Sequence, residues 1–356
     1  MTQYYVGFDV HQKTTVAAVL DANGKQIINA VIETKVDSLT AFLKGIGGNI
    51  ELTFEEGTQA NWLYEILTPL VKKLIVCDPR RNKLIGDGNK NDYIDAQKLA
   101  FLLRAGSLTP TYHGDNSKNH LKEIVRCYNC LIQDVTRVKN RIKAVFRGRG
   151  IGCAGEQIYK AEKRGQFLSL LIQEGLRFRA EKLFDELDYL EKMRTQTHQE
   201  MIRESKKQPD YKRLLEIPML GPIRVSQLLA VAVTPHRFRT KRQFWSYCGL
   251  AVVTRSSSDY QFVGEKLKRT KKAPLTRGLN PVHNRHLKQV FKSAAFDASF
   301  REPFKPFYER DVSNGTKPEL ARLNLARKIA AITLRVWKKG EKFDESKLNL
   351  PNLEFA

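Results

Sequence analysis

Apolar positions in the first third of the chain alternate between strand-like and helix-like spacing. Runs rich in β-branched and aromatic residues, bounded by turn residues, predict strands at 4–10, 15–20, 25–34, 50–54 and 73–77. Helical spacing predicts helices at 37–43, 62–70 and 91–105. Strands that alternate with helices predict an α/β domain over residues 1–115, with helices packed against a sheet.

The middle of the chain changes to long helical periodicity. Apolar residues recur at helical spacing at Leu121, Val125, Tyr128, Ile132, Val135, Ile142 and Phe146. A second apolar repeat follows a glycine-rich break and includes Leu183, Leu187 and Leu190. We predict long antiparallel helices over residues 116–207, either a coiled-coil arm that pairs with another protomer or a helical bundle within one chain.

Residues 208–345 predict a mainly α-helical C-terminal domain. The stretch 214–230 has the form helix, glycine-containing turn, helix, and 320–337 has the pattern of an amphipathic helix. Between them, residues 254–284 are basic and show little periodicity.

Charge and cysteine usage narrow the class of protein. Lys and Arg number 61 against 38 Asp and Glu, which gives a net charge of +23 and favours a polyanionic partner, nucleic acid by default. Five scattered cysteines are typical of a reducing cytosol rather than a disulfide framework. No apolar run is long enough to span a bilayer, and the N-terminus lacks a signal-peptide layout. We therefore expect a cytoplasmic protein.

Acidic residues stand where apolar elements end or begin. Asp9 alternates against the large side chains of the first strand, and Glu55 ends the fourth, with Glu56 as the competing candidate. Asp92 and Asp95 are three apart, on one face of a helix start. Carboxylates that converge from separate elements are the hard oxygen ligands that Mg²⁺ takes. We predict a Mg²⁺ site made by these four acids.

Motifs in both halves resemble one protein family. The first half carries Gly7-Phe-Asp-Val-His11, the strand end at Glu55 and Lys90-x-Asp-x-x-Asp-Ala96; the second carries Ile217-Pro-x-x-Gly-Pro222, Arg237-Phe-x-x-x-x-Gln-Phe244 and Tyr247-Cys-Gly-Leu250. In this order they resemble the DEDD insertion-sequence transposases also called bridge recombinases, relatives of the pilin-gene invertase. The resemblance covers nearly the whole chain.

The resemblance implies both a fold and an activity. It implies a RuvC-like (RNase H-like) domain that holds Mg²⁺ through Asp9, Glu55, Asp92 and Asp95. It implies a C-terminal transposase domain, and a homodimer or homotetramer that acts on donor and target DNA. It also implies a bacterial protein associated with the nucleoid. Target selection in the family is delegated to a structured non-coding RNA, which fits a chain rich in charge and without an evident base-reading motif.

The resemblance also implies a serine nucleophile. Counting from the Gly-Leu motif, the matching position is Ser257, and it would form a phosphoserine link with DNA. The sequence departs from the family pattern in two places, with Val252 where Pro is expected and Ser258 where Gly is expected. Because three serines are consecutive, Ser256 and Ser258 stay open as alternatives.

Two stretches concentrate positive charge and predict phosphate contacts. They contain the expected nucleic-acid-binding residues Arg137, Lys139, Arg141, Lys143, Arg147, Arg149, Lys266, Lys268, Arg269, Lys271 and Lys272. Such charge supplies affinity for nucleic acid without sequence readout.

The sequence thus predicts a DNA transposase that cleaves and exchanges strands through a phosphoserine intermediate, with separate half-sites that different protomers supply. One alternative is a RuvC-like junction nuclease that uses the four acids with water as nucleophile. A second is a non-catalytic nucleic-acid-binding protein.

Overall fold

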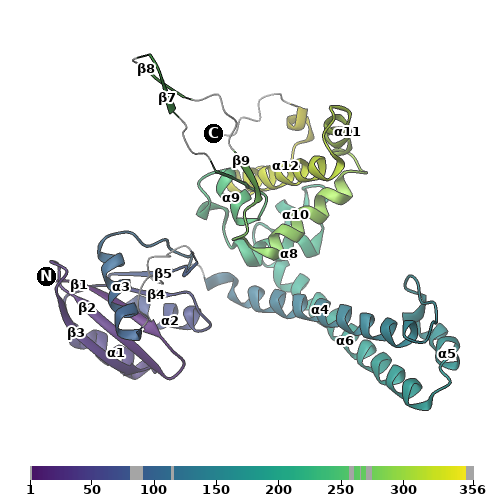
Figure 1. The fold of residues 1–356 in the computed structure, drawn as a ribbon, viewed down its shortest axis with the longest axis horizontal. Coiled ribbons are helices and arrows are strands. Elements are labelled where there is room, and N and C mark those ends of the chain that lie inside the picture. Colours follow the sequence, from purple (N-terminus) through teal and green to yellow (C-terminus); the bar gives the residue numbers. More distant parts are fainter. Residues whose placement is uncertain are drawn as a thin grey trace. The chain divides into compact units, whose positions relative to one another are not determined.

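The computed structural model describes residues 2–80, 91–113, 116–255, 260–264, 266–269 and 275–349. The chain separates into two compact units, Met1–Asp115 and Asn116–Ala356, and each is described by itself (Figure 1).

The first unit is built on a five-stranded sheet. Its strands are β1 (Gln3–Val10), β2 (Thr14–Leu20), β3 (Gln26–Glu33), β4 (Asn49–Glu55) and β5 (Lys73–Cys77). They lie in the order β3-β2-β1-β4-β5. The pairs among β1, β2 and β3 are antiparallel, whereas β4 pairs in parallel with both β1 and β5. This confirms the predicted α/β class, and the sheet fits an RNase H-like domain.

Helices cover both faces of this sheet (Figure 1). On one face, α1 (Val36–Ile46) and α2 (Ala60–Leu67) bury their leucines against Phe8 and Phe54. On the other face, α3 (Asp92–Arg104) contributes Ala96 to a small apolar cluster with residues of β2. The large side chains of β1 therefore face α1 and α2, and its alternate positions face α3.

The second unit begins with two long helices. Helix α4 (Asn119–Arg147) and helix α6 (Glu174–Lys206) are joined through the shorter α5 (Ala161–Ser169). Val138, Ile142 and Phe146 of α4 share a buried cluster with Phe184 and Leu187 of α6. We call the part of this helix pair built around that cluster, residues 134–191, the arm. The predicted helices are confirmed as a pair within one chain, whereas a coiled coil between protomers stays a prediction.

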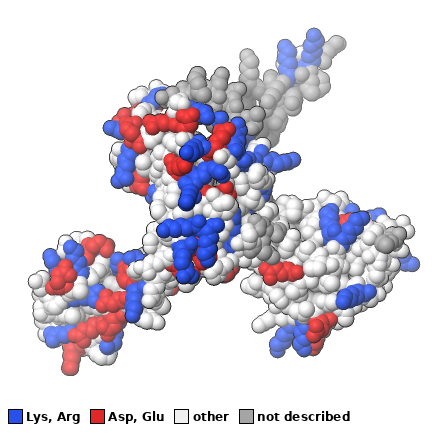
Figure 2. Space-filling view, turned by 180° about the vertical axis from the view of Figure 1, so that it is seen from behind, with Lys and Arg blue, Asp and Glu red and all other residues white. Residues whose placement is uncertain are grey.

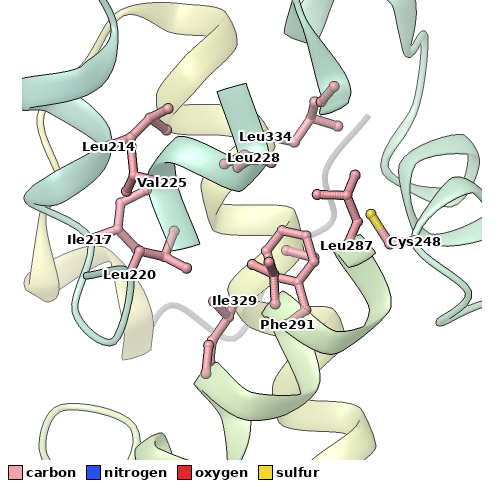
Figure 3. Close-up of a cluster of buried hydrophobic side chains, with 14 of the residues drawn as sticks. Leu214, Ile217, Leu220, Val225, Leu228, Cys248, Leu287, Phe291, Ile329 and Leu334 are labelled. Atoms are coloured by element: carbon pink, nitrogen blue, oxygen red, sulfur yellow. The ribbon is translucent and has the colours of Figure 1, made fainter. Parts of the chain in front are cut away.

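The rest of the unit is a mainly helical domain, as predicted. Its helices are α7 (Tyr211–Leu215), α8 (Pro222–Ala232), α9 (Lys241–Tyr247), α10 (Arg285–Ala298), α11 (Lys305–Ser313) and α12 (Pro318–Lys339). Figure 3 shows its core, where Val225 of α8, Phe291 of α10 and Ile329 of α12 meet. Leu121 of α4 and Met201 of α6 belong to the same core, and the predicted boundary between 207 and 208 stays a prediction.

Four short strands interrupt the helices: β6 (Val252–Arg255), β7 (Tyr260–Val263), β8 (Lys266–Arg269) and β9 (Leu275–Leu279). β6 pairs with β9 and β7 pairs with β8, both antiparallel. The sequence showed little periodicity here because strands of four or five residues are too short to display alternation. Within the described residues, we find no helix with the length and apolar character that crossing a membrane requires.

Candidate metal centre

A glycine on β1 lets helix α3 lie directly against the sheet. Gly7 and Asp9 are two residues apart on one strand and therefore share a face. A Cβ atom at Gly7 would lie 2.2 Å from the carbonyl oxygen of Ala96 and 2.6 Å from the amide nitrogen of Ala100. Only glycine permits this approach, which brings the first turn of α3 close to Asp9.

The strand carboxylates emerge at one edge of the sheet. β1 and β4 are parallel, and Phe8 pairs with Phe54. Asp9 and Glu55 each follow their phenylalanine by one residue, so both lie at the same end of neighbouring strands. The sequence predicted that these acids would converge, without saying where in the sheet.

The start of α3 supplies two further carboxylates. Asn91 caps the helix, since its side-chain oxygen accepts a hydrogen bond of 3.0 Å from the Tyr93 amide. Asp92 and Asp95 both fall in the first turn, where the helix dipole favours negative charge. The Oδ1 atom of Asp95 is buried and accepts no hydrogen bond from the described residues, and Lys98 Nζ lies 3.9 Å from it.

His11 connects the strand acid to the helix acid. Its Nε2 atom lies 3.3 Å from Asp9 Oδ2 and 3.4 Å from Asp92 Oδ2. The ligand atoms of these three side chains all lie within 4.8 Å of one another. One imidazole nitrogen thus sits between two carboxylates that repel each other.

Burial and like charge raise the pKa of both strand carboxylates. Burial is the main cause of the raised pKa of Asp9, His11 opposes it, and Asp92 and Asp95 add to it. Burial likewise raises the pKa of Glu55, and the charges of Asp9 and Asp95 add to the shift. The raised pKa values show that the four predicted acids share one electrostatic neighbourhood.

This donor set fits a divalent cation. Carboxylate oxygens are the ligands that Mg²⁺ prefers. Like-charged, half-buried acids are costly unless a cation compensates them. Asp95 Oδ1 is a buried acceptor that receives no hydrogen bond from the described residues, although Lys98 Nζ lies 3.9 Å away. The structure thus brings Asp9, His11 and Asp92 together as possible ligands, whereas Glu55 and Asp95 are outside this group and are linked to it by their charge effects on the pKa values of Asp9 and Glu55.

The neighbouring acid Glu56 has other contacts. Its Oε2 atom accepts a hydrogen bond of 2.9 Å from Thr111 Oγ1 and lies 2.6 Å from His113 Nε2. The pKa shift of Glu55 includes a contribution from Asp78, which directly follows β5. We had not predicted Asp78 as a site residue, although an acid just after a buried strand was the signal that identified Glu55.

The predicted nucleophile Ser257 and its alternatives Ser256 and Ser258 lie outside the described residues. The described strand β6 ends at Arg255, directly before them. Proximity between these serines and the carboxylates therefore stays a prediction.

Described contacts fix the turn that leads into β6. Gly249 has a φ of +66°, and a Cβ atom there would lie 2.5 Å from His283. The side-chain amide of Asn280 donates to Ser246 Oγ over 2.9 Å, and Arg327 Nε donates to the Leu250 carbonyl over 2.8 Å. The Gly-Leu motif is thus the rigid base from which the serine-bearing segment departs.

The basic run on the arm is partly neutralised. Arg137 pairs with Asp134, Lys139 lies between Glu156 and Glu191, and Arg141 pairs with Glu186. Figure 2 shows blue and red side chains intermixed over this part of the molecule. Lys143 Nζ lies 5.2 Å from the centre of the Tyr159 ring, and Arg149 donates to Gln173. Arg147 is exposed and forms no ion pair within the described part of the chain.

The second basic stretch is only partly described. Lys266 and Lys268 are exposed on β8, and Arg269 is its last residue. Lys271 and Lys272 lie outside the described residues.

Comparison with known families gives two matches in chain order. Residues 6–149 match a family model described as a DEDD transposase of the IS110 type, and residues 211–309 match a model described as the transposase IS116/IS110/IS902 family. Together they span most of the chain, including all four candidate metal ligands in the first and the Gly-Leu motif in the second. A search of curated proteins found no matching relative.

Proposed function

Because this chain belongs to the IS110 family of DNA transposases, we propose that it moves an insertion sequence by Mg²⁺-dependent strand cleavage and exchange, with Ser257 as nucleophile. Family membership carries the transposase activity. The metal, the serine, a guide RNA and the assembly are the steps that this proposal adds.

The convergence of carboxylates is the observation that supports the metal. Asp9, Glu55, Asp92 and Asp95 would hold it, and Glu56 is disfavoured because Thr111 and His113 already occupy its side chain. A bound Mg²⁺ would neutralise charge on a DNA phosphate and make it a better electrophile. His11, which lies between Asp9 and Asp92, is placed to keep these two side chains oriented toward each other.

The proposed reaction conserves the number of phosphoester bonds. The Ser257 oxygen forms a bond to phosphorus while one phosphorus–oxygen bond of the DNA backbone breaks. The serine hydroxyl loses its proton to a base, and the departing DNA oxygen gains one. The phosphoserine link then stores the bond for rejoining to another strand, which permits exchange through a four-way junction.

We further propose a structured guide RNA and a homodimer or homotetramer, acting at the nucleoid where the DNA lies. The exposed lysines on β8 support phosphate contacts of either nucleic acid. Sequencing the RNA that co-purifies with the protein tests the guide, since one abundant species encoded beside the gene is expected. Random cellular RNA would contradict it.

A covalent trap tests the nucleophile. Purified protein is incubated with end-labelled donor DNA and Mg²⁺, denatured, and examined for protein-linked label. The label is expected for the wild type and for Ser256→Ala and Ser258→Ala, and it should be lost in Ser257→Ala. The two neighbouring variants are matched controls because each removes one hydroxyl from the same run of serines.

The same trap distinguishes the main alternative. If the wild type forms no adduct and Ser257→Ala still cuts DNA in the presence of Mg²⁺, the protein is a nuclease that uses water as the nucleophile. If the adduct disappears in Ser256→Ala or Ser258→Ala instead, the assignment of the nucleophile moves to that serine.

A further inference from the structure

An arginine on α12 is surrounded by three aromatic rings at the surface of the C-terminal domain. The Arg322 guanidinium carbon lies 5.3 Å from the ring centre of Phe296, 5.9 Å from that of Phe300 and 5.4 Å from that of Tyr308. Phe296 and Phe300 contact each other with centroids 5.4 Å apart. We call these four residues the aromatic patch.

The two phenylalanines are costly to expose, and the described residues of the unit do not cover them. Phe296 is 53% exposed and Phe300 60% exposed. Single exposed apolar residues are ordinary, but adjoining exposed rings around a cation are typical of a binding surface. The backbone beneath them is fixed, since Ala295, Ala298 and Ser299 are all buried.

The charge around the patch favours an anionic partner. Arg322 forms no ion pair with any described residue, and its Nε donates only a long bond of 3.5 Å to Ser299 Oγ. Lys292 lies one helical turn before Phe296, and Arg301 directly follows Phe300; both are exposed, and neither pairs with an acid among the described residues. Among the acids next to these residues in the chain, Asp297 is paired with Arg224 over 2.7 Å, whereas Glu302 and Glu319 are exposed; the three cations still exceed these two acids.

Exposed rings beside unpaired cations match the chemistry of an unstacked nucleotide. A base can stack on an aromatic face while its phosphate meets the cation. A partner protein would bury the rings equally well, but it would also have to place a carboxylate next to Arg322. Strand exchange releases single strands from a DNA duplex, so unpaired DNA bases are present during the reaction of this family.

We propose that the aromatic patch binds unpaired bases of single-stranded DNA by stacking on Phe296 and Phe300. This inference rests on the action on DNA and is independent of the metal and of Ser257. It assigns the C-terminal domain a role in holding a strand that has left its duplex.

Binding of labelled oligo-dT, measured by fluorescence anisotropy, tests the proposal. Phe300→Ala should weaken binding about tenfold, because one stacked base contributes on that order. Phe300→Trp should restore it. Arg322→Lys should also weaken binding, without changing the salt dependence, because the charge stays while the planar guanidinium is lost. Phe178→Ala is the matched control, since Phe178 is 61% exposed beside Lys182 on the arm.

Measuring the affinity for duplex DNA of the same length distinguishes base stacking from general DNA binding. The proposal expects duplex affinity and thermal unfolding to be unchanged in Phe300→Ala. Equal loss for duplex and single strands, or no loss for either, would overturn it. Tenfold preference of the wild type for single-stranded RNA over DNA, or co-purification of a protein partner that Phe300→Ala releases, would also overturn it.

Discussion

Carboxylates have opposite electrostatic surroundings in the sheet domain and in the arm. In the sheet domain, Asp9 and Glu55 face other acids, and their pKa values are raised. In the arm, Asp188 accepts hydrogen bonds of 2.6 and 2.7 Å from both terminal nitrogens of Arg164, and this contact lowers the pKa of Asp188. Asp188 is thus paired within the arm, whereas Asp9 and Glu55 lie among other acids whose charge a divalent cation would compensate.

The difference separates structural charge from functional charge. The high count of Lys and Arg on α4 predicted a phosphate-binding surface, but several of these cations already pair with acids of the arm. In the sheet domain, the candidate acids lie beside one another, with His11 between Asp9 and Asp92 and Lys98 near Asp95. Unpaired charge, rather than the number of charges, therefore marks the candidate site.

Replacing one acid by its amide in each region should give the largest difference in the rate of DNA cleavage. Asp9→Asn removes a proposed metal ligand and should reduce DNA cleavage at least about a hundredfold, because a metal contributes several kcal/mol to stabilising charge in the transition state. Asp188→Asn should leave cleavage unchanged. Both are measured as initial cleavage rates of donor DNA at saturating Mg²⁺.

Metal binding gives a second readout for the same pair. Mg²⁺ should raise the thermal unfolding temperature of the wild type and of Asp188→Asn, because a ligand that binds only the folded state stabilises it. It should not do so in Asp9→Asn. Full cleavage in Asp9→Asn would remove the metal centre from the mechanism.

Part of this contrast could be read from the sequence. The five strands, the parity of Asp9 and the helical spacing of Asp92 and Asp95 follow from local patterns, so the carboxylate set was predictable. The ion pairs of the arm were not, since the partners of Lys139 lie 17 and 52 residues away in the chain. Such long-range pairing depends on how α4 and α6 pack, which periodicity alone does not determine.

The close approach of α3 to β1 could not be predicted from the sequence either. A glycine within a strand pattern indicates a bulge or a close contact but does not say what approaches it. The structure identifies the helix that carries Asp92 and Asp95 as the neighbour of Gly7. The approach of α3 to the candidate metal ligand Asp9 therefore depends on a residue with no side chain.

Replacing Gly7 by a larger residue tests the packing of α3 against β1 without changing any charge. Gly7→Val should destabilise the first unit by about 3 kcal/mol, because its side chain would overlap the α3 backbone at Ala96 and Ala100. Cleavage should fall with it as α3 moves away from Asp9. Urea unfolding provides the measurement.

Another glycine supplies the matched control. Gly45 lies in α1 with open space around its Cβ position, so Gly45→Ala should stabilise the protein by about 1 kcal/mol and leave cleavage unchanged. If Gly7→Val were as stable as the wild type, α3 would not lie against β1 as described.

The smallest expected effect is an opposite pH dependence in the two regions, measured without divalent ions. The raised pKa values of Asp9 and Glu55 mean that the folded state keeps protons that the unfolded chain has lost, so the unfolding free energy falls as pH rises above their ordinary values of 3.8 and 4.5. The lowered pKa of Asp188 has the reverse sign: its contribution is present above pH 3.8 and is lost as pH falls through the lowered pKa. Relative to the wild type, Asp9→Asn should therefore gain stability as pH rises from acid to neutral, whereas Asp188→Asn should lose it. The unfolding free energy of each variant relative to the wild type, obtained from urea unfolding in EDTA, should change in opposite directions with pH. If the two variants changed in parallel, the acids of the sheet domain would be as well compensated as those of the arm. The case for a cation among them would then fail.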